Sequence, residues 1–359
     1  MSTVIDPADD SEGSPPADGA VEASAGSTMK PEEAADLGTA LETEVAKVIV
    51  GQRDLVRLVL VGLLCEGHVL LEGVPGLGKT ELVKALSAAL DLQVARVQCT
   101  PDLLPSDLTG TQVLEEDETG RRQFAFRSGP VFANLLLADE VNRATPRTQS
   151  ALLEAMQERA VTSGGTTRLL PRPFFVMATQ NPLEMEGTYP LPEAQLDRFL
   201  VKALVPFPSA ADLAMVVERT TGGAAAEIKP VASGPKLSAA IALTREVPIA
   251  SHLVAHAVDL VMATLPSGAT APEQVRRYVR FGASPRGAQA LVLAAKATAL
   301  LEGRPNVSAD DLRAVAPAAL RHRLVLGYEA AVDQVDADAL VEAVLDAVPA
   351  PSVGLRGVG

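Results

Sequence analysis

The segment Gly73–Thr80 constrains the fold of this chain more than any other part of the sequence. It reads Gly-Val-Pro-Gly-Leu-Gly-Lys-Thr, follows the short apolar run His68–Glu72 and opens a helical pattern. In such a GxxxxGK[ST] pattern, glycines let backbone N–H groups curl around phosphate oxygens, and the helix adds the positive end of its dipole. The context therefore predicts a strand, a phosphate-binding loop and a helix in direct succession.

Individual residues of this loop have distinct expected roles. Lys79 is expected to reach the β- and γ-phosphates of a nucleotide, and the Thr80 hydroxyl to ligate Mg²⁺. The alternative is a glycine-rich turn between strand and helix that binds no ligand. We predict a nucleotide site that includes Gly73, Val74, Pro75, Gly76, Leu77, Gly78, Lys79, Thr80 and Glu81.

A pair of carboxylates follows a second apolar strand candidate. The run Asn134–Ala138 leads directly into Asp139 and Glu140. In open α/β sheets, ligands bind at the carboxyl ends of the strands. We therefore expect Asp139 to hold Mg²⁺, directly or through water. Glu140 is expected to orient and activate the attacking water as a general base.

Asn181 and Arg198 are two further candidates at strand boundaries. Asn181 follows the apolar run Phe174–Ala178, where it would hold the nucleophilic water or contact the γ-phosphate; the alternative is a plain Asn-Pro turn. Arg198 would stabilise charge in the transition state, and such an arginine can come from another subunit. The alternative for Arg198 is a surface ion pair with Asp197 or Glu193.

Arg286 stands at the start of a helical pattern in the second half of the chain. Ser284 is a plausible N-cap and Pro285 fits the first helical position. From a helix start, Arg286 would reach a phosphate across the cleft between two domains. The alternative is an arginine that only faces solvent.

The pattern is helical from about Pro31, and from His68 strand and helix patterns alternate until about Pro206–Pro208. The alternation predicts a mostly parallel sheet with helices on both faces. Two inserts, Thr109–Ser128 and Ala160–Leu170, are expected to form β-hairpins. The strand candidates are His68–Glu72, Gln93–Gln98, Asn134–Ala138, Phe174–Ala178 and Phe199–Val205.

Only helical patterns are expected from Lys236 onward, including Ser251–Ala263, Pro285–Glu302 and Ala309–Leu320. The predicted organisation is therefore an α/β core followed by an all-helical domain. Its divisions are a disordered acidic extension at 1–30, the core at 31–207, a linker with a connecting helix at 208–235, the helical domain at 236–350 and a flexible end at 351–359.

Composition excludes several classes of protein. Aromatic residues make up 3% and Trp is absent, which argues against stacking platforms for single-stranded nucleic acid. The formal net charge of −14 argues against broad binding to a phosphate backbone. Cys65 and Cys99 belong to no CxxC pair, so no disulfide framework is expected. With no signal peptide and no apolar run near the roughly 20 residues of a membrane span, we expect a cytoplasmic protein.

Taken together, these segments resemble the MoxR family of AAA+ ATPases over more than four fifths of the chain. The segments that carry the resemblance are VIVGQ (Val48–Gln52), the phosphate loop, TPDLLPSDLTG (Thr100–Gly110), FRSGPVFANLLLADEVNRA (Phe126–Ala144), QSALLEAMQE (Gln149–Glu158), ATQNP (Ala178–Pro182), EGTYPLPEAQLDRF (Glu186–Phe199) and GASPRG (Gly282–Gly287). The two hairpins are similar to the helix-2 insert and the pre-sensor-1 hairpin of that family.

The resemblance implies roles for several residues. Asn181 corresponds to sensor 1, Arg198 to the arginine finger and Arg286 to sensor 2. In the family the adenine is contacted at the positions of Val50, Gly51 and Gln52.

The implied activity is ATP hydrolysis with ATP and Mg²⁺ as cofactors, in a hexameric ring with a chaperone-like role. Such ATPases typically act with a partner that carries a von Willebrand factor A domain, often in maturation or cofactor insertion of a client complex. Two alternatives stay open: a nucleic-acid motor on the same fold, and a scaffold gated by ATP with little turnover. The client, the identity of the partner, the nucleotide dependence of assembly and the role of the acidic extension are left open.

Overall fold

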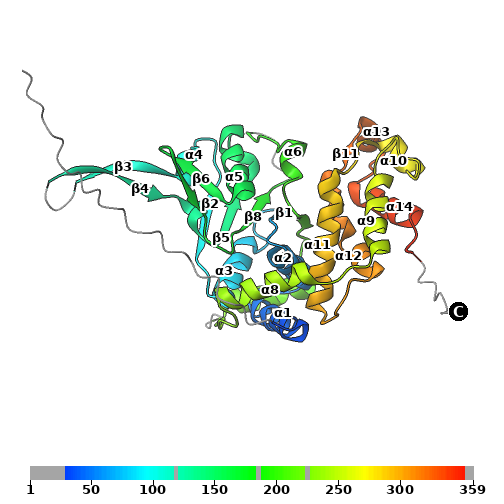
Figure 1. Ribbon diagram of the computed structural model, residues 1–359, viewed down its shortest axis with the longest axis horizontal. Helices are drawn as coiled ribbons and strands as arrows, with labels where there is room; N and C mark the ends of the chain where they lie inside the picture. The colour runs from blue at the N-terminus through cyan, green and yellow to red at the C-terminus, as the bar shows by residue number, and fades with distance from the viewer. Residues whose placement is uncertain (1–28, 117–119, 183–186, 223–226, 352–359) are drawn as a thin grey trace, which may run out of the picture.

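A central parallel sheet organises the first half of the molecule. The computed structural model describes residues 29–116, 120–182, 187–222 and 227–351. The five strands lie in the order β2-β5-β8-β1-β9, and every neighbouring pair is parallel (Figure 1). All five strand predictions are confirmed, with ends shifted by up to two residues. The strands are β1 (Val69–Glu72), β2 (Val94–Gln98), β5 (Leu135–Asp139), β8 (Phe175–Gln180) and β9 (Val201–Leu204).

Helices cover both faces of the sheet. Because side chains alternate along a strand, Leu135 and Leu137 enter one hydrophobic core while Leu136 and Ala138 enter the other. Both faces of β5 are thus buried, as expected for a parallel strand. The first core contains side chains of α1 (Pro31–Ala46), α2 (Arg53–Leu64) and α3 (Lys79–Leu90); the second contains side chains of α4 (Pro105–Thr109) and α5 (Pro146–Glu158).

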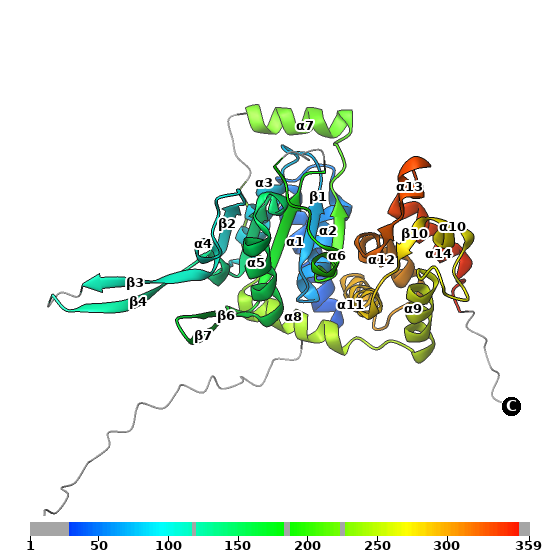
Figure 2. The ribbon, with the colours of Figure 1, turned by 90° about the horizontal axis from the view of Figure 1, so that it is seen from above.

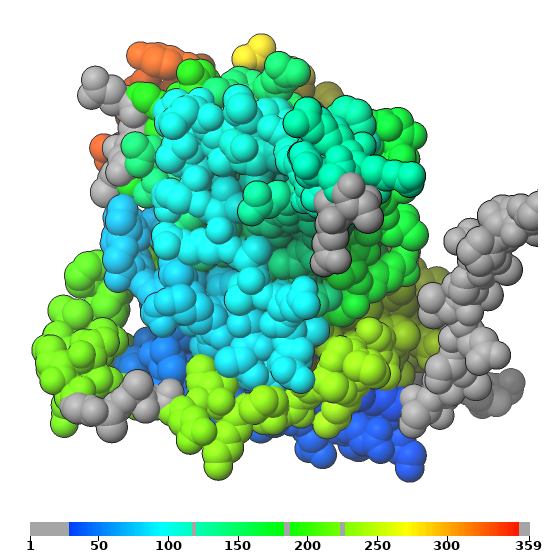
Figure 3. Space-filling model, turned by 90° about the vertical axis from the view of Figure 1, so that its left-hand side faces the viewer, coloured from blue at the N-terminus to red at the C-terminus, as the bar shows by residue number. Residues whose placement is uncertain are grey.

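Both predicted hairpins are present and project from one end of the molecule (Figure 2), the end that faces the viewer in Figure 3. The long hairpin pairs β3 (Gly110–Glu116) with β4 (Arg122–Ser128), and the short one pairs β6 (Ala160–Ser163) with β7 (Thr166–Leu169). The two hairpins are in contact. The Arg168 guanidinium of the short hairpin lies 4.0 Å from the centre of the Phe126 ring of the long hairpin. This contact ties the two inserts together.

Four further helical elements lie in the connections between the strands and after β9. They are η1 (Pro130–Phe132), η2 (Val141–Arg143), α6 (Glu193–Leu196) and α7 (Ala210–Thr221), the last within the stretch predicted as linker and connecting helix. None of the residues of α7 is buried. The helix lies at the rim of the core in Figure 2, where its Arg219 donates hydrogen bonds to the carbonyls of Ala46 and Lys47.

A bundle of helices follows, as predicted. Its longest member, α11 (Pro285–Leu301), packs against α9 (Ser251–Ala263) and α12 (Ala309–Leu320). The predicted helices at Ser251–Ala263 and Ala309–Leu320 have the expected bounds, and α11 ends one residue early. The other elements are α8 (Gly234–Glu246), α9 (Ser251–Ala263), α10 (Glu273–Tyr278), α12 (Ala309–Leu320), η3 (Arg321–Arg323), α13 (Tyr328–Val332) and α14 (Ala337–Ala347).

The expectation of helices alone after Lys236 is wrong at two short segments. Val279–Phe281 (β10) and Val325–Leu326 (β11) form a small antiparallel sheet. Strands of three and two residues are too short to show an alternating pattern in the sequence. Their pairing joins the segment before α11 to the segment after η3.

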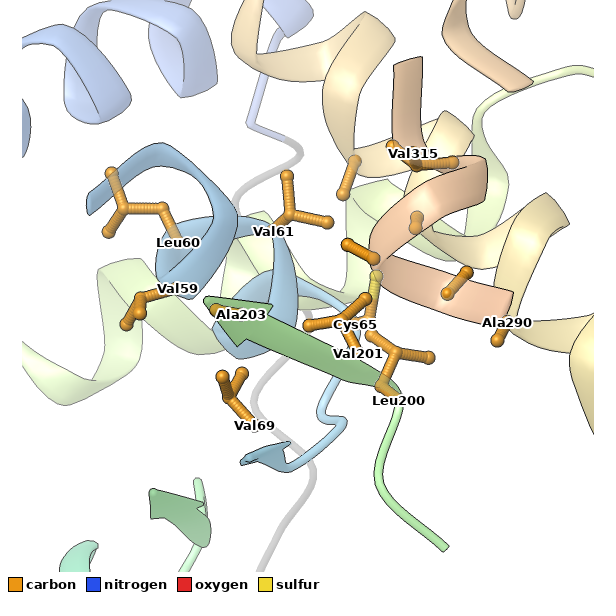
Figure 4. Packing of buried hydrophobic residues seen from close by; sticks show 14 of the residues in the cluster. Val59, Leu60, Val61, Cys65, Val69, Leu200, Val201, Ala203, Ala290 and Val315 are labelled. Atoms are coloured by element: carbon orange, nitrogen blue, oxygen red, sulfur yellow. The ribbon is translucent and has the colours of Figure 1, made fainter. Parts of the chain in front are cut away.

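The two halves share one hydrophobic core. Figure 4 shows Val201 and Ala203 of β9 between α2 and the helices that carry Ala290 and Val315. Small aliphatic side chains fill this junction, in keeping with a chain that has only 3% aromatic residues. The extension at 1–28 and the end at 352–359 lie outside the described residues.

No single helix among the described residues has the length and apolar character needed to cross a bilayer. One pair of described helices, α8 and α9, passes that test when taken together, and the pair is bent by 89° at the break between them.

Candidate nucleotide site

The phosphate loop, the carboxylate pair and Asn181 meet at the carboxyl edge of the sheet. A pocket of about 340 Å³ is lined by residues Pro75–Glu81 together with Asp139, Glu140 and Asn181. These side chains come together because β1, β5 and β8 are parallel neighbours that end at the same edge. The structure thus places in one pocket residues that lie more than 100 positions apart in the sequence.

The loop has the backbone shape that its glycines permit. Gly76 and Gly78 have φ of +84° and +79°, the left-handed region that side chains other than glycine rarely adopt. α3 begins at Lys79, so the free N–H groups of its first turn belong to the pocket wall. The Lys79 ammonium donates a 2.5 Å hydrogen bond to the Gly73 carbonyl. Burial lowers the pKa of Lys79, and the neighbouring carboxylates, first Asp139, partly offset this effect.

Asp139 and Glu140 are held by different partners. Thr179 Oγ1 donates to Asp139 Oδ1 at 2.6 Å and accepts from the Glu140 backbone N–H at 2.8 Å. Glu140 Oε2 accepts from Gln98 Nε2 at 2.7 Å and from Arg143 Nη1 at 3.0 Å. Sequence reasoning missed Thr179, Gln98 and Arg143. The only available signal for Thr179 was its place among the polar residues that end β8.

Asn181 directly follows β8 and is only 5% exposed. The Asn-Pro dipeptide comes immediately after the last residue of β8, and the residues that would complete an Asn-Pro turn lie outside the described part of the chain. The side chain also lines the pocket beside Glu140, however, so the position fits contact with a water or a γ-phosphate.

The predicted adenine-contacting segment lies beside the loop. Gln52 Nε2 donates to the Leu77 carbonyl at 3.3 Å, and Gly51 has φ of +72°. Gly51 and Gln52 also line a neighbouring pocket of about 340 Å³ against α1. Val50, which precedes them, is half-buried. The Asp212 side chain of α7 closes over Gly51, where a Cβ would lie 2.4 Å from its Cγ.

Arg198 and Arg286 lie elsewhere. Both line a cavity of about 270 Å³ together with Gly67 and His68, the two residues that precede β1. This cavity is therefore at the amino edge of the sheet, whereas the phosphate loop follows the carboxyl end of β1. The expectation that Arg286 reaches a phosphate across its own domain cleft is not met by this arrangement.

The predicted helix start at Arg286 is correct in its local details. Ser284 Oγ accepts a 3.1 Å hydrogen bond from the Arg286 N–H, and Pro285 occupies the first turn. Arg286 Nη1 lies 3.6 Å from Asp197 Oδ2 and its side chain is half-exposed.

Arg198 forms no ion pair with Asp197 or Glu193. Among the residues that the structure describes, its Nε is buried without a hydrogen-bond partner and its guanidinium forms no ion pair. Asp197 is instead engaged by Arg323, whose Nε lies 2.9 Å from Asp197 Oδ1. The surface ion pair considered as an alternative for Arg198 is therefore absent among the described residues.

A basic segment of η3 joins the helical domain to β9. Arg323 is 6% exposed and donates to the carbonyls of Phe199 at 2.7 Å and Leu200 at 3.1 Å. Arg321 donates to the Lys202 carbonyl at 3.0 Å. Burial, and then the Arg323 cation, lower the pKa of His322 well below its usual range, so this ring is neutral at pH 7.

Two family models match separate parts of the chain. Residues 68–201 match the ATPase family associated with various cellular activities (AAA), and residues 272–344 match the AAA lid domain. Chaperone MoxR1 of Mycobacterium tuberculosis is 44% identical over 310 residues, which cover 86% of this chain and 81% of the relative. Protein MoxR of Methylorubrum extorquens is 35% identical over 335 residues, which cover 88% of this chain and 96% of the relative.

The chain belongs to the MoxR family of AAA+ ATPases. A crystal structure of a Cytophaga hutchinsonii protein has a TM-score of 0.84 to it at 39% identity, and covers 90% of this chain and 97% of that one. The predicted α/β core and helical lid of the MoxR family are thereby confirmed, apart from the small sheet of β10 and β11.

Proposed function

We propose that this MoxR-family chain binds ATP with Mg²⁺ in the phosphate-loop pocket and hydrolyses it to ADP and phosphate. The Thr80 hydroxyl and the Asp139 carboxylate both line this pocket. Oxygen donors of these two kinds are the ligands that Mg²⁺ prefers, so the residues present fit the ion. When bound, Mg²⁺ would neutralise charge that develops on the phosphates. An ATPase core at 31–207 and a lid at 236–350 are part of the proposal; both family matches fall inside these ranges.

Three other residues of the pocket would have separate roles in phosphate binding, proton transfer and positioning of water. The Lys79 ammonium would exchange its hydrogen bond to the Gly73 carbonyl for contacts with the β- and γ-phosphates. Glu140 would take a proton from the attacking water, and Asn181 would hold that water or the γ-phosphate in place. The hydrogen bonds that Glu140 accepts from Gln98 and Arg143 would fix the direction of its carboxylate.

We further propose that hydrolysis takes place between subunits of a hexameric ring. The observation that carries this proposal is the position of Arg198, which lies at the opposite edge of the sheet from its own phosphate loop and has no ionic partner among the described residues. A cation placed there can stabilise transition-state charge only on a nucleotide held by a neighbour. Arg286 lines the same cavity and would face the same nucleotide.

The biological role that we propose is remodelling of a client complex with a partner that carries a von Willebrand factor A domain. Maturation or cofactor insertion of the client would be the outcome. Support comes from the name of one relative, Chaperone MoxR1, and from the two hairpins that project from the core. The exposed Leu114 and Phe124 lie directly opposite each other on the long hairpin and offer an apolar contact for a protein client.

Phosphate release measured over a range of protein concentrations tests the enzymatic part. A ring that hydrolyses ATP between subunits should show a specific activity that rises with concentration, in parallel with assembly followed by sedimentation velocity. A constant specific activity in a monomeric fraction would contradict hydrolysis between subunits. ATP binding without phosphate release would instead support the scaffold that is gated by ATP.

A further inference from the structure

The edge strand β2 presents two polar side chains to the nucleotide pocket. Arg96 and Gln98 both line it, while the intervening Val97 is buried in the second hydrophobic core. Gln98 is the register partner of Asp139, and Arg96 lies two positions earlier on the same face. This alternation directs both side chains toward the end of β5, where the carboxylate pair stands.

Arg96 binds the carboxylate that is expected to hold the metal. Arg96 Nη2 lies 2.8 Å from Asp139 Oδ2, and the same nitrogen lies 3.1 Å from Gln98 Oε1. The other oxygen of Asp139 accepts the hydrogen bond from Thr179. Both oxygens of Asp139 therefore have a protein partner, and one of these partners is a cation.

Lys79 does not take this role. Its ammonium donates to the Gly73 carbonyl, so the cation that touches Asp139 in this arrangement is Arg96. Arg143 plays the corresponding part at Glu140. Each carboxylate of the pair is thus neutralised by its own arginine.

We propose that Arg96 is a positioning residue that competes with Mg²⁺ for Asp139. The proposal rests on the nucleotide site described above and extends it to the order of events in the pocket. A guanidinium and Mg²⁺ cannot both approach the same carboxylate oxygen, since like charges repel strongly at a few ångströms. Direct binding of Mg²⁺ to this oxygen of Asp139 would therefore displace Arg96, and loss of Mg²⁺ would let the ion pair form again.

Two features suit Arg96 to reversible release. Its side chain is 51% exposed on an edge strand, so the ion pair is weak enough to be exchanged for a divalent cation. The contact with Gln98 keeps the guanidinium beside the pocket after it leaves Asp139. A buried arginine in the same place would hold the carboxylate too firmly.

The test measures binding of a fluorescent ADP analogue at increasing Mg²⁺ and does not require turnover. ADP lacks the γ-phosphate, so it does not report contacts of Arg96 with that group. Arg96→Met removes the charge and keeps the length of the aliphatic stem. The variant should reach half-saturation at roughly twofold to fivefold lower Mg²⁺ than the wild type, the range for a partly exposed ion pair. ADP affinity in the presence of EDTA should not change.

Two controls separate this role from a general effect of charge. Arg122→Met removes an exposed arginine that pairs with Glu116 on the long hairpin, and should leave the Mg²⁺ dependence as it is. In an Asp139→Asn background, Arg96→Met should produce no further shift, because its effect passes through the Asp139 carboxylate.

Several results would overturn the proposal. They are an unchanged or higher Mg²⁺ requirement in Arg96→Met, an equal shift in the Asp139→Asn background, or weaker ADP binding in EDTA, which would make Arg96 a phosphate ligand. Failure of the wild type to bind the ADP analogue at any Mg²⁺ concentration would refute the nucleotide site itself, and is thus distinguishable from failure of the Arg96 proposal.

Discussion

Asp197 and Arg323 form an ion pair across the junction of core and lid, with 2.9 Å between Oδ1 and Nε. Ser284 Oγ donates to the other oxygen of Asp197 at 2.8 Å. Asp197 immediately precedes Arg198, so these contacts fix the backbone from which Arg198 extends. They also engage the acid that would otherwise neutralise Arg198. Among the described residues, the Arg198 guanidinium therefore has no ion-pair partner.

Loss of this pair should destabilise the protein strongly. Arg323→Met would remove the nearest cation from the Asp197 carboxylate, which is 15% exposed, and one hydrogen-bond donor from each of the carbonyls of Phe199 and Leu200. We expect the free energy of unfolding, measured by urea denaturation, to fall by about 3–5 kcal/mol. Arg313→Met is the matched control, because Arg313 is 54% exposed and its ion pairs within the described part of the chain are with exposed acids of α14. The control should lose at most about 1 kcal/mol; equal losses would refute a special role for Arg323.

Glu140→Gln should separate ATP binding from hydrolysis. The amide keeps the shape of the side chain and a hydrogen-bonding oxygen, but it cannot accept a proton from water. Phosphate release should fall by about 10²–10⁴-fold while affinity for ATP is retained. Radiolabelled ATP should consequently stay bound to the variant without conversion to ADP. Turnover near the wild-type rate would remove Glu140 from the role of general base.

Lys79→Ala should weaken nucleotide binding itself. Removing a charged donor to the phosphates should reduce affinity for ATP by roughly tenfold to a hundredfold in equilibrium titrations. Lys84→Ala provides a control on the same helix, since Lys84 is exposed and pairs with Glu81. Affinity should change little in this control. Unchanged ATP affinity in Lys79→Ala would count against the phosphate-loop assignment.

The sequence alone was enough to predict the carboxyl edge of the sheet. The phosphate loop and the Asp139–Glu140 pair each lie at the end of an apolar run, and parallel strands bring such ends together. By contrast, Thr179 and Arg96 are polar residues within strands, where no spacing pattern distinguishes a residue of the site from a surface side chain. Their roles become visible only when the register of β2, β5 and β8 is known.

Local sequence patterns also could not predict the contacts between distant segments of the chain. Arg323 and Asp197 are 126 positions apart, and neither belongs to a motif that points to the other. The local signal at Arg286 correctly predicted a capped helix start, but the direction in which that helix faces depends on how the lid packs on β9. The sequence alone therefore could not predict which cavity Arg286 lines.

Arg198→Ala tests hydrolysis between subunits most directly. Its own phosphate loop stays intact, so the variant should bind ATP normally. Hydrolysis should fall by roughly 10³–10⁵-fold, the range for loss of an arginine that stabilises transferring phosphate. Lys79→Ala has the reverse defect, because it retains the arginine but not the phosphate-loop lysine. Neither variant should hydrolyse ATP appreciably alone.

Mixing the two variants under conditions of subunit exchange should restore part of the activity. In a mixed ring, an Arg198→Ala subunit holds ATP in an intact loop, and a neighbouring Lys79→Ala subunit supplies the missing arginine. A mixture of Lys79→Ala with Glu140→Gln is the control, because Lys79 and Glu140 line the same pocket of one chain and no subunit in that mixture has both. Recovery in the first mixture alone requires Arg198 to act on a neighbour. If sedimentation shows that mixed rings have formed and phosphate release stays absent, Arg198 does not act between subunits.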